Sequence, residues 1–119
     1  MKTSKANYKE FRGYVDYWQR ELGLFDWNIH FEHRDEDDAY AKTFMSYKGR
    51  VATIVLNVDW FDRQVDSRGL KKTALHECLH LVTADLMCEA ASRYTQEFDV
   101  EKAEEAIVVR LTNLIARLV

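Results

Sequence analysis

The spacing of apolar residues predicts a helix and then a strand in the first third of the chain. Over residues 8–22 an apolar side chain recurs every three or four positions, which is typical of an amphipathic helix, and Gly23 follows where such a helix would end. Residues 27–33 alternate between apolar and polar, as in a half-buried strand. The run of charge over 34–38 indicates a solvated turn.

Two more strands are expected in the middle of the chain, over 39–47 and 50–57. Lys48 and Gly49 lie between them, and we expect a tight turn in which Gly49 supplies the positive φ. The second of these strands is apolar on both faces. That pattern predicts a strand covered by other elements on each side.

The second half of the chain has the pattern of two helices. Residues 68–89 carry apolar side chains at helical spacing, and Asp66 or Ser67 stands where it can cap that helix. A last helix begins near Asp99. We expect its inward face to consist of Val100, Ala103, Ile107, Leu111, Leu114 and Leu118. The order of elements predicts one α+β domain over residues 1–119, with a three-stranded, mostly antiparallel sheet between an N-terminal helix and the last two helices.

Composition narrows the range of partners. The chain has 119 residues, and its 20 acidic against 17 basic residues give a net charge of -3, so no basic excess indicates a nucleic-acid partner. No apolar run is long enough to span a membrane, and the first ten residues lack the apolar segment of an export signal. Cys78 and Cys88 would lie about 15 Å apart on one continuous helix, too far for a disulfide, so we expect free thiols, which suit a reducing cytoplasm.

His76 and His80 are four residues apart on the helix predicted over 68–89. Residues at that spacing project from one face of a helix, so both imidazoles can bind the same metal ion. Glu77 is turned by about 100° from His76, and in that position it can take a proton from a metal-bound water. The spacing therefore predicts a metal site with an adjacent base.

The segment 76–80 reads His-Glu-Cys-Leu-His, and with the glutamates of a later helix it resembles the zincin superfamily of metallopeptidases, in particular the gluzincin branch. From Arg50 onward the layout is similar to small zincin-like metallopeptidases of phages and bacteria. The resemblance implies a zinc-dependent peptidase that hydrolyses peptides or proteins with a zinc-bound water activated by Glu77. The metzincin branch is excluded, because Thr83 and Leu86 stand where that branch has a glycine and a histidine.

The resemblance further implies that the third Zn²⁺ ligand is a glutamate on the next helix. Glu104 is in register with the expected inward face of that helix, so we prefer it, and Glu101 and Glu105 remain alternatives. Larger gluzincins often have an acid four residues after the ligand, where it orients a zinc histidine. Glu105 stands at that distance from Glu101, whereas Val108 stands there from Glu104.

For other parts of such a site the sequence offers more than one candidate residue. Tyr94, Tyr47 and His30 are candidates for an oxyanion donor by residue type. Asp85 or a backbone carbonyl can orient a zinc histidine. The resemblance also implies that an edge strand, one of the two strands of the hairpin, pairs with an extended substrate.

Two further functions fit the same residues. One is a zincin-fold module that binds zinc and docks a protein partner without hydrolysis. The other is a small α+β interaction domain without a metal. Glu77 favours the peptidase, because a purely structural zinc site has no use for a base beside the metal. We expect a cytoplasmic protein, located in the host cytoplasm if a phage encodes it, and the pattern leaves the oligomeric state open.

Overall fold

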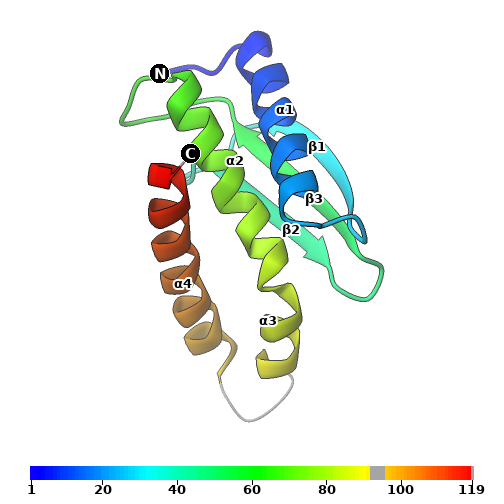
Figure 1. Ribbon diagram of the computed structural model, residues 1–119. Coiled ribbons are helices and arrows are strands. Elements are labelled where there is room, and N and C mark those ends of the chain that lie inside the picture. The colour runs from blue at the N-terminus through cyan, green and yellow to red at the C-terminus, as the bar shows by residue number, and fades with distance from the viewer. Residues whose placement is uncertain (92–95, 119) are drawn as a thin grey trace.

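The structure, a computed structural model, describes residues 1–91 and 96–118 of the chain. Its elements are α1 (Lys5–Glu21), β1 (Asn28–Arg34), β2 (Ala41–Ser46), β3 (Val51–Asn57), α2 (Ser67–Val82), α3 (Ala84–Ala91) and α4 (Glu97–Leu118). The strands form one sheet, with α1 and α2 packed in front of it and α4 beside α2 (Figure 1). This arrangement confirms the α+β class.

The sheet is mixed, with the strand order β1-β3-β2. β3 pairs in parallel with β1 and antiparallel with β2, so the sheet is not antiparallel throughout. The parallel pair arises because the chain leaves β1 for the far edge of the sheet and returns through the β2–β3 hairpin into the centre. β2 is therefore an edge strand, and it is in contact with α2.

Helices cover only one face of β3, so the expectation of cover on both sides is wrong. Ala52, Ile54 and Leu56 point toward the helices and join the core. Val55 points the other way and is still fully buried, between Glu32 on β1 and Lys42 on β2. Within residues 1–91 and 96–118 no helix lies over that face (Figure 1). The neighbouring strands, rather than a second layer, shield the central strand.

The helix α1 confirms the amphipathic helix that the sequence predicts over residues 8–22. Ser4 and Asn7 form a capping box at its start, and Phe11, Val15 and Trp18 are its buried residues. The helix ends just before Gly23, which has a φ of 68°.

The positive φ of the β2–β3 turn belongs to Arg50, at 55°, and not to Gly49 as the sequence suggested. The guanidinium of Arg50 lies over the rings of Trp27 and Tyr47, at 5.0 Å and 4.8 Å, and pairs with Asp85 at 2.9 Å. These contacts offset the cost of the left-handed backbone, about 1–2 kcal/mol for a residue other than glycine.

The helix expected over 68–89 is two helices, because α2 ends at Val82 and α3 begins at Ala84. Asp66 is the N-cap of α2, and its carboxylate accepts a hydrogen bond from the backbone N–H of Gly69. The break occurs at Thr83, whose hydroxyl lies 3.4 Å from the carbonyl oxygen of Leu79 and also contacts a carboxylate of α4. A threonine bonded back to its own helix bends or ends that helix.

The inward face of α4 is not the apolar stripe that the sequence predicts. Its buried residues are Glu104, Val108 and Thr112. Four residues of the predicted face are exposed instead: Ala103, Ile107 at 40%, Leu114 at 46% and Leu118 at 75%. The prediction was wrong because it ranked positions by apolarity, whereas Glu104 is held inward by hydrogen bonds to α2.

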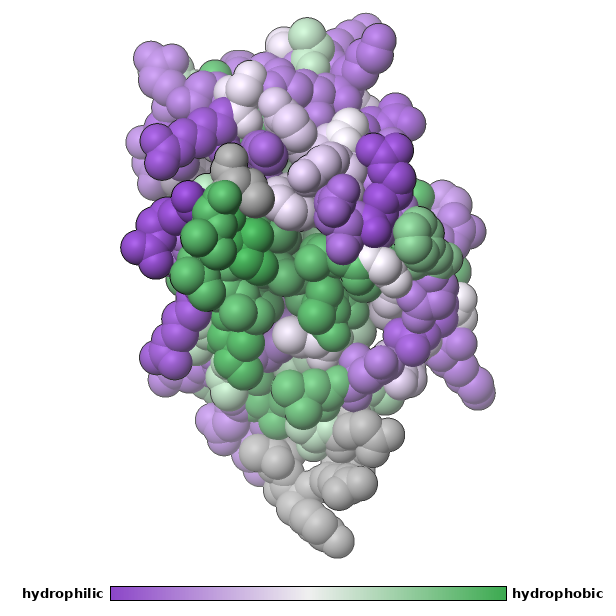
Figure 2. Space-filling view, viewed as in Figure 1, coloured by the Kyte–Doolittle hydropathy of each residue, from purple (hydrophilic) through white to green (hydrophobic). Residues whose placement is uncertain are grey.

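The apolar side chains turned away from the core contribute to a broad surface. Figure 2 shows apolar residues gathered over α4 and over the α2–α3 segment on one face of the molecule. Exposed apolar residues of these helices include Val82, Leu86, Ile107, Leu114 and Leu118.

In the described part of the chain, no helix has both the length and the apolarity to cross a membrane.

Asn57, at the end of β3, holds the loop that leads from β1 to β2. Its side-chain amide donates hydrogen bonds to the carbonyl oxygens of Glu36 and Ala39, and its Oδ1 accepts one from the backbone N–H of Asp59 at 3.1 Å. The side chain is almost completely buried. This loop brings Tyr40 to the start of β2.

Asn57→Ala is expected to lower the free energy of unfolding by about 2–3 kcal/mol, because it leaves buried backbone groups without partners. Urea denaturation followed by circular dichroism measures the change. Asn28→Ala, at an exposed position of β1, is the matched control and should stay within about 0.5 kcal/mol of the wild type. Equal losses in the two variants would contradict this account of the loop.

Candidate metal centre

His76, His80 and Glu105 meet where α2 and α4 lie side by side. Nε2 of His76 is 3.0 Å from Oε1 of Glu105, and Nε2 of His80 is 3.2 Å from Oε2 of the same residue. One donor atom from each of the three lies within 4.8 Å of the others. Tetrahedral zinc with bonds of about 2.0–2.1 Å places its ligand atoms about 3.3 Å apart. Two imidazoles and a carboxylate are therefore gathered closely enough that they could hold a metal ion.

The two histidines converge because of helix geometry. They are one turn apart on α2, and their ring centroids are 5.0 Å apart. Both side chains are partly exposed, so the donor atoms lie at the rim of the α2–α4 contact and not inside the core. A metal ion bound there keeps a side open to solvent, as a catalytic site requires.

Glu104 lies on the other nitrogen of His80. Its two carboxylate oxygens are 3.1 Å and 3.0 Å from Nδ1 of His80, and it also accepts a hydrogen bond from the hydroxyl of Thr83. Glu104 is only 7% exposed. A carboxylate at Nδ1 fixes the proton there and leaves Nε2 free to bind a metal.

This arrangement differs from the expectation that Glu104 is the third ligand. Glu104 does face inward, as its register predicted, but the Nε2 atoms of the histidines point to the rim, where Glu105 lies. Glu101 is exposed and does not belong to the group.

Glu77 lies between α2 and the edge strand β2. It is 4% exposed, and its Oε1 accepts a hydrogen bond of 2.7 Å from the hydroxyl of Thr43. Burial raises the pKa of Glu77 above its ordinary value, and the charges of His80 and His76, with the Thr43 hydrogen bond, oppose that rise. The result is a carboxylate with enhanced basicity beside His76 and His80.

The electrostatics of His80 follow from its acidic neighbours. Burial by itself lowers the pKa of His80, but the hydrogen bond to Glu104 and the charges of Glu77, Glu104 and Glu105 outweigh it, and the net shift is upward. For the acid Glu104 the directions are reversed. Burial raises its pKa, but the hydrogen bonds from His80 and Thr83 lower it by more, and the net shift is downward. Binding of a metal ion at Nε2 of His80 would therefore compete with the protonated form of His80, which its acidic neighbours stabilise.

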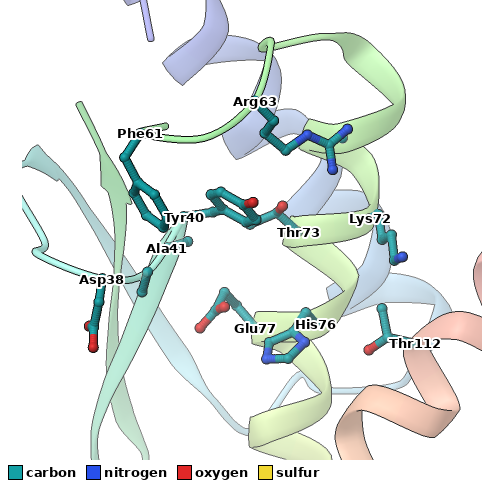
Figure 3. A pocket seen from close by; sticks show the side chains of 12 residues that line it. Asp38, Tyr40, Ala41, Phe61, Arg63, Lys72, Thr73, His76, Glu77 and Thr112 are labelled. Carbon is teal, nitrogen blue, oxygen red and sulfur yellow. The ribbon is translucent and has the colours of Figure 1, made fainter. Parts of the chain in front are cut away.

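A cavity of about 420 Å³ opens beside His76 and Glu77. Tyr40 and Phe61 form a wall of stacked rings, with centroids 5.5 Å apart, and Arg63 lies 5.9 Å from the ring centre of Tyr40. Figure 3 shows Glu77 and His76 projecting from α2 below these aromatic side chains. Ala41, the first residue of β2, also lines the cavity, so the edge strand leads into it.

Several other sequence candidates lie apart from this centre. His30 is exposed on β1 and pairs with Thr53, on the face of the sheet that the helices do not cover. The hydroxyl of Tyr47 bonds to Asp85, and Asp85 also pairs with Arg50, so it does not orient a zinc histidine. Tyr94 lies outside the described residues.

Sequence reasoning missed two polar side chains that hold the site. Thr83 lies three residues after His80, on the same helical face, so helix periodicity alone carried a signal for it. Thr43 carried no such signal. It reaches Glu77 only because β2 lies at the sheet edge that faces α2.

Comparison with known proteins finds no similar protein. The chain matches no protein-family model, no curated protein and no solved structure. Interpretation of the site therefore depends on the geometry of its own residues.

Glu105→Gln is expected to weaken zinc binding by more than Glu104→Gln, because Glu105 contributes a donor atom and Glu104 only orients His80. Loss of an orienting carboxylate costs about 10–100-fold in metal affinity. Competition with a chromophoric chelator measures both affinities. Glu101→Gln, an exposed change on the same helix, is the control and should bind like the wild type. A larger loss for Glu104→Gln would make Glu104 the ligand.

Proposed function

We propose that the chain is a zinc-dependent peptidase of the zincin type, with His76, His80 and Glu105 as zinc ligands and Glu77 as the general base. The position of Glu77 is the observation that carries this proposal. Its carboxylate is buried beside the histidines, borders a cavity, and is held by a hydroxyl of the edge strand. A structural zinc site would gain nothing from a buried acid in that place.

The residues of the chain divide the work of hydrolysis. A bound zinc ion supplies a Lewis acid that polarises the scissile carbonyl and lowers the pKa of water. Glu77 accepts the proton of the attacking water at a carboxylate oxygen and returns it to the leaving amine. Thr43 bonds to Oε1 and so sets the direction of the carboxylate. Glu104 holds the ring of His80 in the orientation that presents Nε2.

The edge strand supports a peptide or protein as the substrate. β2 pairs with β3 on one side only, so its other edge has backbone groups that an extended chain can pair with. β2 also carries Thr43 beside Glu77, which places any added strand next to the base. The proposal includes a cytoplasmic location, the host cytoplasm for a phage-encoded chain, supported by the free thiols of Cys78 and Cys88.

The second candidate function is a zinc-bearing module that docks a protein partner. The exposed apolar side chains over α4 and the α2–α3 segment favour it, because surfaces of this kind mark interaction sites (Figure 2). The buried base favours the peptidase over the module.

Glu77→Gln is expected to lower the rate of peptide cleavage by about 10²–10⁴-fold, because it removes the group that accepts the proton. Zinc content should remain near one equivalent, since Glu77 is not a ligand. Mass spectrometry of a digested peptide library measures cleavage, and elemental analysis measures zinc.

Three outcomes would decide against the peptidase. Cleavage that survives in zinc-loaded Glu77→Gln removes Glu77 as the base. If the zinc-loaded wild type cuts no peptide in a broad library, the docking module is the function that remains. Less than about half an equivalent of zinc in protein purified without chelators rejects both metal proposals in favour of a metal-free interaction domain.

Thr43→Val is expected to lower kcat by about tenfold with little change in KM, because the lost hydrogen bond positions the base and not the substrate. That bond also lowers the pKa of Glu77, so its loss raises the pKa and moves the acidic limb of the pH–rate profile to higher pH. Thr43→Ser should restore both properties. Thr53→Val, on the uncovered face of β3, is the control. An unchanged pH profile in Thr43→Val would exclude this role.

A further inference from the structure

Cationic side chains gather at one end of the candidate site, around the first turns of α2. Arg63 and Lys72 line the cavity that contains His76 and Glu77. They also line a second, larger cavity of about 1040 Å³. The cations of this second cavity are Arg63, Arg68, Lys71, Lys72 and Arg117. We call these five residues the cationic wall.

The charge of the cationic wall is largely uncompensated. Asp66 is the acid that lines the second cavity, and it is engaged with Gly69 at 2.7 Å and with Arg63 at 3.7 Å. Lys72 forms no ion pair with the described residues and stands one helical turn before His76. In a chain with a net charge of -3, this is a local excess of positive charge.

The indole side chain of Trp18 has a buried hydrogen-bond donor. Nε1 of Trp18 is buried and has no partner among the described residues. Trp18 lines the cavity together with the cationic wall and is only 4% exposed. Buried indole N–H groups nearly always have an acceptor, so this unpaired donor is an exception in the fold.

The direction of β2 relates the cationic wall to the scissile bond. The strand starts at Ala41, which lines the same cavity as Arg63 and Lys72 but lies across it from them (Figure 3), and runs on toward Ser46. A peptide paired antiparallel with β2 runs the other way, so the part that follows the scissile bond extends toward Ala41. Asp38 lies at the opposite side of this cavity from Arg63 and Lys72 (Figure 3).

We propose that the cationic wall binds carboxylates of the substrate segment that follows the scissile bond, so that acidic peptides are the preferred substrates. This inference rests on the proposed peptidase function. The carboxylates belong to Asp or Glu side chains or to the free C-terminus of the substrate. A peptide fits better than a nucleic acid because the wall continues into the cavity of Glu77 and leads to an open strand edge.

Peptide binding to zinc-loaded Glu77→Gln protein, which does not cut, tests the proposal separately from cleavage. The probes are matched peptides with three Glu, three Gln or three Lys after the central bond, and one with three Glu before it. The peptide with Glu after the bond should bind at least about tenfold tighter than its Gln counterpart, and its advantage should shrink as salt rises from 50 to 500 mM. Amidated and free C-termini distinguish the terminal carboxylate from the side chains.

Charge-removing variants locate the binding. Lys72→Gln and Lys71→Gln, each made in the Glu77→Gln protein, should weaken the acidic peptide about fivefold and leave the Gln peptide unchanged. Lys102→Gln, an exposed lysine on α4 outside both cavities, is the matched control and should have no effect.

The outcomes separate this inference from the proposed function. Acid-selective binding without cleavage by the wild type supports the carboxylate site and removes the peptidase. Efficient cleavage with equal binding of Glu and Gln peptides keeps the peptidase and overturns the inference. A preference for Glu before the bond also overturns it, as does a single-stranded oligonucleotide that displaces the acidic peptide and binds more tightly.

Discussion

The contact of Glu104 with His80 and Thr83 is the interaction on which the rest of the site depends. It holds the N-terminal half of α4 against α2, although the most apolar side of α4 would pack there more readily. The Thr83 hydroxyl that joins it also marks the end of α2. With Glu104 on Nδ1 of His80, the next residue, Glu105, lies beside Nε2. One buried carboxylate thus sets the helix rotation, the ring orientation and the position of the third donor.

The sheet contributes the second constraint, through its mixed order. Because β3 takes the centre, β2 is left at the edge beside α2, and the hydroxyl of Thr43 donates a hydrogen bond to Glu77. An all-antiparallel meander in chain order would have put β2 in the centre, with no free edge for a peptide. The topology therefore brings Glu77, its hydroxyl partner and the free strand edge together, and Arg63 and Lys72 line the cavity beside Glu77.

Most of the fold could be predicted from periodicity, because each element buries one face and the spacing of apolar residues records that face. The helix over 8–22 and the three strands are found within a few residues of their predicted places. The failures share a cause. Local preference predicted a positive φ at Gly49, an apolar inward face for α4 and one continuous helix over 68–89. In each case polar contacts with distant residues gave a different result, and these contacts are made by Arg50, Glu104 and Thr83, respectively.

The sequence by itself determined the chemistry of the candidate site. His76, Glu77 and His80 lie on a helix whose geometry puts two imidazoles on one face and a carboxylate beside them, whatever the rest of the chain does. Only the tertiary structure shows that Glu105 lies beside Nε2 of both histidines and Glu104 beside Nδ1 of His80, because these positions depend on how α4 is rotated against α2. The roles of Thr43 and the cationic wall likewise required the packed fold, since they join residues that no local pattern relates.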